Sequence, residues 1–96
     1  MTSVNVSLQI IPVEADECIY GVVDKVIEFI EASGVKYEVG PMETTMEGEL
    51  DILLDIVKKS QEICTREGAK RVVSIVKIDY KLEGVTMDEK IGKYRR

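Results

Sequence analysis

The chain of 96 residues is 45% hydrophobic and 32% charged, the composition and length of an ordinary folded protein with one domain, residues 1–96. A net charge of −5 argues against binding to nucleic-acid phosphates, which requires a basic surface. No apolar run approaches the roughly 18 residues of a membrane span, and the N-terminus lacks the basic start and apolar centre of a signal peptide. We therefore expect a cytoplasmic protein with no membrane segment.

Residues 3–11 alternate between apolar and small polar side chains, which predicts a half-buried first strand. Pro12 cannot donate to a strand ladder, so the strand is expected to end or bulge there. Asp16 is a suitable N-cap for the helix that follows. That helix is expected to stop at Gly34, and its apolar residues at helical spacing are Ile19, Val22, Val23, Val26, Ile27 and Ile30.

The second half of the chain follows a similar plan. The predicted elements are a strand over 35–39, a turn at 40–42, a strand over about 43–48, a helix over about 49–67, a strand over 70–82 and a short helix over 87–95. Gly68 ends the longer helix, whose apolar stripe runs through Leu53, Leu54 and Val57. Thr86 and Glu89 predict a capping box for the short helix, which is marginal unless it docks on another element.

The order β-α-β-β-α-β, followed by a short C-terminal helix, predicts an α+β fold of the ferredoxin-like type. This split βαβ arrangement places both long helices on one face of an antiparallel sheet. The other face would carry Asn5, Ser7 and Gln9 together with Glu38 and Lys77. It lacks the basic and stacking aromatic residues of an RNA-binding sheet, so nucleic acid is not an expected partner.

The last strand has apolar residues on both faces, which predicts that another subunit covers the side away from the helices. Lys77 and Asp79 lie on one face of this strand. We interpret them as partners of a salt bridge between subunits.

The residues argue against catalysis and against a metal site. Cys18 and Cys64 have no Cys-x-x-Cys spacing, and the chain contains no histidine. An acylphosphatase, an enzyme of the same fold, needs an arginine cradle for phosphate and a positioned asparagine. The only asparagine is Asn5, and the first strand–helix junction has acids but no arginine. We therefore predict a protein that is not an enzyme and has no cofactor.

The segment around the central turn carries the most distinctive polar groups. Gly40 and Pro41 bend the chain, and Thr44, Thr45 and Glu47 follow within a short strand. One interpretation is a hairpin with polar residues on its solvated face. The other is a rigid support that presents directed polar groups to a ligand.

Residues 40–49, Gly-Pro-Met-Glu-Thr-Thr-Met-Glu-Gly-Glu, resemble the Gly-Pro-Met-x-Thr-x-x-Glu-Gly segment of the small thiamine-binding proteins, long catalogued as an uncharacterised family. The N-terminal Val-Ser-Leu-Gln-Ile-Ile-Pro-Val and the closing Thr-Met-Asp-Glu-Lys-Ile are also similar. The resemblance implies a ferredoxin-like fold, a homotetramer of paired dimers, and binding of thiamine or its hydroxymethylpyrimidine portion. By position it implies ligand contacts at Thr44, Glu47, Gly48 and Pro12.

Thiamine carries an aminopyrimidine with one amine donor and ring-nitrogen acceptors, and a permanent thiazolium cation. A site for it needs a carboxylate or carbonyl and hydroxyl or amide donors. We therefore expect Glu47 and Thr44 to line one pocket, with Asn5 and Ser7 across the neighbouring strand. A buried Glu47 would need the ligand, a lysine or backbone N–H groups as partner. The predicted function is non-catalytic binding as a carrier, buffer or sensor, and the alternative is an oligomeric interaction module without a small-molecule ligand.

Overall fold

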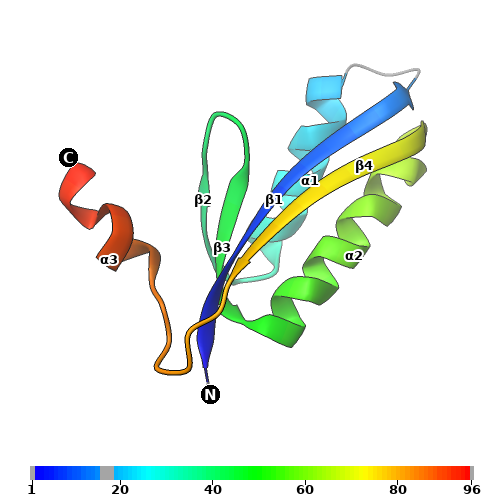
Figure 1. The fold of residues 1–96 in the computed structure, drawn as a ribbon. Helices are drawn as coiled ribbons and strands as arrows, with labels where there is room; N and C mark the ends of the chain where they lie inside the picture. Colours follow the sequence, from blue (N-terminus) through cyan, green and yellow to red (C-terminus); the bar gives the residue numbers. More distant parts are fainter. Residues whose placement is uncertain (1, 16–18, 96) are drawn as a thin grey trace.

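The computed structural model describes residues 2–15 and 19–95. Their elements are β1 (Ser3–Ala15), α1 (Ile19–Ala32), β2 (Lys36–Val39), β3 (Thr44–Glu49), α2 (Leu50–Arg66), β4 (Ala69–Asp79), α3 (Met87–Ile91) and a 3-10 turn (Gly92–Tyr94) (Figure 1). The sheet has the order β2-β3-β1-β4 and every pairing is antiparallel. The predicted α+β fold of the ferredoxin-like type is confirmed. The expected N-cap Asp16 and Cys18 lie outside the described residues.

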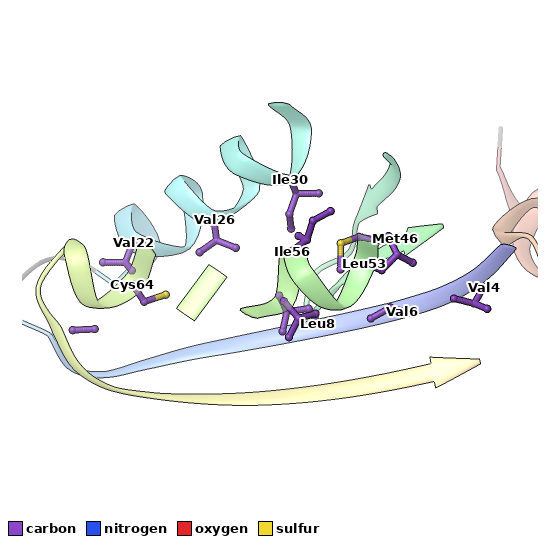
Figure 2. Close-up of a cluster of buried hydrophobic side chains, with 12 residues drawn as sticks. Val4, Val6, Leu8, Val22, Val26, Ile30, Met46, Leu53, Ile56 and Cys64 are labelled. Atoms are coloured by element: carbon purple, nitrogen blue, oxygen red, sulfur yellow. The ribbon is translucent and has the colours of Figure 1, made fainter. Parts of the chain in front are cut away.

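The core lies between α1, α2 and one face of the sheet. Alternate residues of β1, which are Val4, Val6 and Leu8, meet the apolar faces of both helices, and Figure 2 shows them in one continuous cluster. Each side chain of this size, removed from water, contributes about 1.5–3 kcal/mol. The stripe of α2 is rotated from the predicted one, because Ile56 is buried and Leu54 is exposed.

Both predicted helix stops are confirmed. Gly34 follows α1 with a φ of 83°, and Gly68 follows α2 with a φ of 106°. Residues with a side chain rarely adopt these left-handed conformations, whereas glycine does so at no steric cost. The two glycines therefore end the helices and allow the chain to return to the sheet.

The prediction that the first strand ends or bulges at Pro12 is wrong, because its register with β4 is unchanged on both sides of Pro12. β1 continues to Ala15, and its pairing with β4 includes Pro12 opposite Val72. β3 pairs only with residues 3–8 of β1, so the later part of β1 has a single neighbour. Alternate residues of such a strand direct their N–H away from the one partner, and a proline is tolerated at those positions.

The short C-terminal helix α3 lies across the sheet from α1 and α2 (Figure 1). The predicted capping box is present: the Glu89 N–H donates to Thr86 Oγ1 and the Thr86 N–H donates to Glu89 Oε1, both at 3.1 Å. Five residues form too short a helix to be stable alone. The contacts described below hold it on the sheet. Among the described residues, no helix is long and apolar enough to cross a membrane.

Candidate binding sites on the two faces of the sheet

The described residues enclose a hollow on each face of the sheet. We call the one on the helix side the hairpin groove, with a volume of about 360 Å³. We call the one on the side of α3 the open-face pocket, with a volume of about 370 Å³. Both volumes are within the range typical of small-molecule sites. Glu43, in the turn between β2 and β3, lines both hollows.

The hairpin groove arises because the β2–β3 hairpin diverges from β1. The last residue pair between β3 and β1 is Thr44 opposite Leu8, and beyond this point the hairpin turn and α1 face each other across β1. Most of the lining is apolar, from Leu8, Ile10, Ile11, Pro12, Val23, Val26, Ile27, Ile30, Val39, Pro41 and Met42. A mostly apolar hollow with few polar groups is the usual form of a site for a flat organic ring.

The polar groups of the groove are placed by the hairpin turn. Thr44 pairs with Leu8, so its side chain lies on the helix face, where it is only 7% exposed. The Gly40 N–H donates to the Glu43 carbonyl at 2.8 Å and closes the turn. A Cβ at Gly40 would lie 2.9 Å from that same carbonyl oxygen, so the turn requires glycine. The bend that the sequence predicts at Gly40 and Pro41 therefore forms one end of the groove.

The open face of the sheet carries two rows of polar residues that run across all four strands. The outer row is Glu38, Thr45, Ser7 and Lys77. The inner row is Lys36, Glu47, Asn5 and Asp79. The pocket lies over these rows, with α3 as its roof.

The inner row holds the C-terminal segment on the sheet, because each of its members contacts that segment. The contacts are Lys36 Nζ to Asp88 Oδ2 at 3.0 Å, the Met87 N–H to Glu47 Oε1 at 2.6 Å, Asn5 Nδ2 to the Val85 carbonyl at 3.4 Å, and Lys90 Nζ to Asp79 Oδ2 at 2.5 Å. Arg95 adds ion pairs with Glu38 and Asp88. The hydrogen bond from Lys36 is the main cause that holds the pKa of Asp88 below its usual range.

Glu47 is therefore an anchor for α3. Its side chain is 14% exposed, accepts a hydrogen bond from the first N–H of the helix, and lies 4.0 Å from the Lys36 ammonium. A carboxylate at a helix N-terminus is favoured by the helix dipole and by the unpaired N–H groups there. Of the partners that the sequence analysis required for a buried Glu47, the structure provides a backbone N–H and a lysine.

Asn5 is the most buried polar residue of the open-face pocket, with 3% of its surface exposed. Its Nδ2 donates to the Val85 carbonyl, which orients the amide. Its Oδ1 is buried and accepts no hydrogen bond from the described residues. A buried acceptor without a partner costs on the order of 1–3 kcal/mol.

In the outer row the hydroxyls of Ser7 and Thr45 lie 2.7 Å apart. The Lys77 ammonium lies 2.7 Å from Glu43 Oε1. This hydrogen bond, followed by one from Ser7, holds the pKa of the Glu43 carboxyl below its usual value. Within the chain Lys77 pairs with Glu43 and Asp79 with Lys90, and the salt bridge between subunits stays a prediction.

The structure divides the site residues predicted from the sequence. Asn5 and Ser7 meet in the open-face pocket, and Glu47 lies beside them but binds α3. Thr44 and Pro12 line the hairpin groove. The expectation that Thr44 and Glu47 line one pocket is wrong, because residues three apart on a strand point to opposite faces.

Gly48 lines neither hollow, and a Cβ at this position would lie 3.6 Å from Leu53 Cδ2 on the helix side. Thr45 and Glu43 also line the open-face pocket and were not among the predicted site residues. Strand parity could have identified Thr45, which shares a face with Glu47. No group of three or more Cys, His, Asp or Glu side chains placed to hold a metal occurs within residues 2–15 and 19–95.

The chain forms a small ferredoxin-like domain with a hollow on each face of its sheet. A family model described as "Thiamine-binding protein" matches residues 6–95, and the chain belongs to this family. It is 73% identical to a UPF0045 protein of Clostridium perfringens over 99% of this chain and 100% of that one. It is also 34% identical to a UPF0045 protein of Bacillus subtilis over 72% of this chain and 68% of that one.

Solved structures agree with this placement. A domain of unknown function, DUF77, from Bacillus cereus is 50% identical with a TM-score of 0.93, and the match covers 98% of this chain and 91% of that one. A Thermotoga maritima protein described as a candidate thiamine biosynthesis/salvage protein is 43% identical with a TM-score of 0.88, over 97% of this chain and 99% of that one. The resemblance found in the sequence is therefore confirmed.

Proposed function

We propose that the protein binds thiamine or its hydroxymethylpyrimidine portion, without catalysis, in the hairpin groove. The observation that carries this proposal is the convergence of the first half of the motif and Pro12 on one hollow. Gly40, Pro41, Met42 and Thr44 come from the segment that resembles the thiamine-binding proteins, and Pro12 comes from the similar N-terminal stretch. Residues separated in sequence by almost thirty positions thus meet at the groove.

The chemistry of the groove suits an aminopyrimidine. Its apolar walls, which include Val26 and Ile30 of α1, provide contact with the faces of the ring. The hydroxyl of Thr44 can donate to a ring nitrogen or accept from the amine. Alternate residues of 9–15 direct backbone N–H and C=O groups to the side of β1 that β3 leaves free. These groups offer the donor and acceptor pattern that the edge of the pyrimidine needs.

Glu43 is the acid of the groove, whereas the sequence analysis expected Glu47 as the carboxylate that accepts from the amine of the ligand. Glu43 is the one acidic residue in the groove's lining, and its carboxylate pairs with Lys77 Nζ at 2.7 Å on the open face. Among the groove's lining residues there is no lysine, cysteine or histidine to act as a nucleophile or base beside it. This composition supports binding without catalysis, in which the protein acts as a carrier, buffer or sensor.

Adjacent threonines on opposite faces of β3 provide the test. Thr44→Val removes the groove hydroxyl and keeps the shape of the side chain, whereas Thr45→Val makes the same change in the open-face pocket. In calorimetric titrations with thiamine and with hydroxymethylpyrimidine, we expect Thr44→Val to weaken binding about tenfold, the value of one hydrogen bond. Thr45→Val should bind as the native protein does. Equal affinity in all three proteins, or a loss only in Thr45→Val, contradicts the proposal.

A thermal-shift screen separates ligand binding from the alternative of an interaction module. A ligand that binds only the folded protein raises its stability by about 2.7 kcal/mol at a hundred times its Kd. Thiamine, its phosphates and hydroxymethylpyrimidine form the panel. If none raises the melting temperature, the interaction module becomes the better account.

We further propose a homo-oligomer, with tetramers of paired dimers as the implied form. β4 is an edge strand, and it and the following residues expose large apolar side chains, namely Val73, Ile75, Val76, Ile78, Tyr80 and Leu82. A long apolar strand edge favours pairing with another chain. Ile75→Lys, at a position 49% exposed, should lower the mass in sedimentation equilibrium. A monomer at micromolar concentration for the native chain contradicts the proposal.

A further inference from the structure

The turn of the β2–β3 hairpin, residues 40–43, extends beyond the backbone pairing that holds β3 to β1. The last pair between these two strands is Thr44 opposite Leu8, and the Gly40 N–H closes the turn on Glu43 rather than on another strand. Figure 1 shows the hairpin separating from β1 toward this turn. The same turn forms one end of the hairpin groove. Its position relative to β1 therefore sets the shape of the groove.

One ion pair connects this turn to the far strand of the sheet. Glu43 lies two residues before Thr45 and shares its side of the hairpin, so its carboxylate is directed to the open face. There Glu43 Oε1 accepts a hydrogen bond from Lys77 Nζ of β4 at 2.7 Å. Ser7 of β1 lies between them, because it pairs with Thr45 on one side and with Lys77 on the other. The contact therefore spans β1 on the open face, whereas the groove lies on the helix face.

The environment of Glu43 keeps its carboxylate charged and in place. The Glu43 side chain is 30% exposed, and the hydrogen bonds from Lys77 and then from Ser7 lower the pKa of its carboxyl. Within the described ranges, the pair with Lys77 is the one ion pair that residues 40–43 make. Lys77 itself is not among the residues that line the groove. An effect of Lys77 on the groove would therefore act through the hairpin turn and not through contact with a ligand.

We propose that Lys77 is a positioning residue for the hairpin groove, which through Glu43 ties the hairpin turn to the sheet and holds the groove in the shape that binds a flat ring. This inference rests on the proposed function of the groove and adds to it a residue from the opposite face of the sheet. Without the tie, the turn moves away from β1 more freely, and a smaller fraction of the molecules has a formed groove. The apparent affinity for a groove ligand falls in proportion to that fraction.

The test compares three changes at the two lysines of the open-face pocket. Lys77→Met removes the ammonium at a side chain that is 67% exposed, so the core is left intact. The probe is hydroxymethylpyrimidine in mildly alkaline buffer, where it is uncharged and does not respond to the altered net charge of the protein. In calorimetry we expect Lys77→Met to bind about twofold to fivefold more weakly, the range that an exposed ion pair supports. Lys77→Arg, which keeps a cation for Glu43, and Lys90→Met, which removes the lysine that pairs with Asp79, should bind as the native chain does.

A double variant shows whether Lys77 acts through Glu43. Because both single changes remove the same contact, Glu43→Gln combined with Lys77→Met should bind no more weakly than Glu43→Gln alone. Independent, multiplying losses in the double variant overturn the inference. So does an affinity in Lys77→Met equal to that of the native chain, or an equal loss in Lys90→Met.

NMR relaxation of the ligand-free protein distinguishes a failure of this inference from a failure of the proposed function. The backbone nitrogens of Met42 and Glu43 should show more rapid, larger motion in Lys77→Met than in the native chain, Lys77→Arg or Lys90→Met. If the native chain does not bind hydroxymethylpyrimidine, the proposed function fails, and the tie is decided by relaxation alone. Unchanged relaxation at both residues in Lys77→Met overturns the tie, whether or not a pyrimidine binds.

Discussion

Removal of the Glu47 carboxylate should release α3 from the sheet while the core stays folded. Glu47 Oε1 accepts the Met87 N–H at 2.6 Å at the start of the helix, and the side chain is 14% exposed. A hydrogen bond to a charged acceptor contributes on the order of 1.5–3 kcal/mol. Because a helix of this length has little stability of its own, nearly all of that loss should appear in the docking of α3. Glu47→Ala therefore tests the anchor directly.

Hydrogen exchange is the suitable assay, because it reports local opening. The N–H groups of Glu89 and Gly92 are bonded within the helix and report its docking. In Glu47→Ala these N–H groups should exchange about tenfold to a hundredfold faster, which corresponds to the free energy of the lost hydrogen bond. The control is Glu49→Ala, two residues along the same face of β3, where the side chain makes no hydrogen bond or ion pair with the described residues. Equal exchange in the two variants would refute the role given to Glu47.

Three further predictions concern charge, packing and backbone conformation. In Lys77→Met the pKa of Glu43 should rise toward its usual value in a carboxyl NMR titration, and an unchanged pKa contradicts the pairing. Because the pKa of Glu43 is lowered in the folded chain, the pair stabilises the native state above the ordinary carboxyl pKa. This stabilisation is lost as the pH falls through the folded pKa. Leu53→Ala, at a fully buried position, should lower the free energy of unfolding by about 2–5 kcal/mol in urea, and a loss below about 1 kcal/mol would be inconsistent with this core. Gly34→Ala, at a φ of 83°, should lower the free energy of unfolding by about 1 kcal/mol in the same assay. Gly21→Ala in α1, where a Cβ meets open space, should raise the free energy of unfolding by about 0.5–1 kcal/mol. A change of the same sign in both variants would contradict the assigned conformations.

The fold could be predicted from the sequence because its signals are local and consistent. Alternation along β1 and apolar spacing along α1 each identify one element, and Gly34 and Gly68 mark where helices stop. The end of β1 was misplaced at Pro12, because only the tertiary pairing shows which side of a strand lacks a neighbour. Local patterns therefore determine the kind of element better than its length.

The candidate sites could be predicted only in part. Asn5 and Ser7 were placed on the same face correctly, since strand parity is a local property. The role of Glu47 could not be predicted, because its partner is a backbone N–H forty positions away at the start of α3. The hairpin groove depends on where the β2–β3 hairpin diverges from β1, and the open-face pocket depends on where α3 docks. No residue pattern within the strands encodes either point.

The measurement that tests the account most directly is an NMR titration of the isotope-labelled chain with hydroxymethylpyrimidine. Occupation of the hairpin groove should shift the backbone amides of Gly40, Met42 and Thr44, together with that of Val26 across the groove. The amides of the open face, such as Thr45, should shift much less. Shifts centred on the open face, or an unchanged spectrum at millimolar ligand, would contradict the proposal that the motif residues form a pyrimidine site.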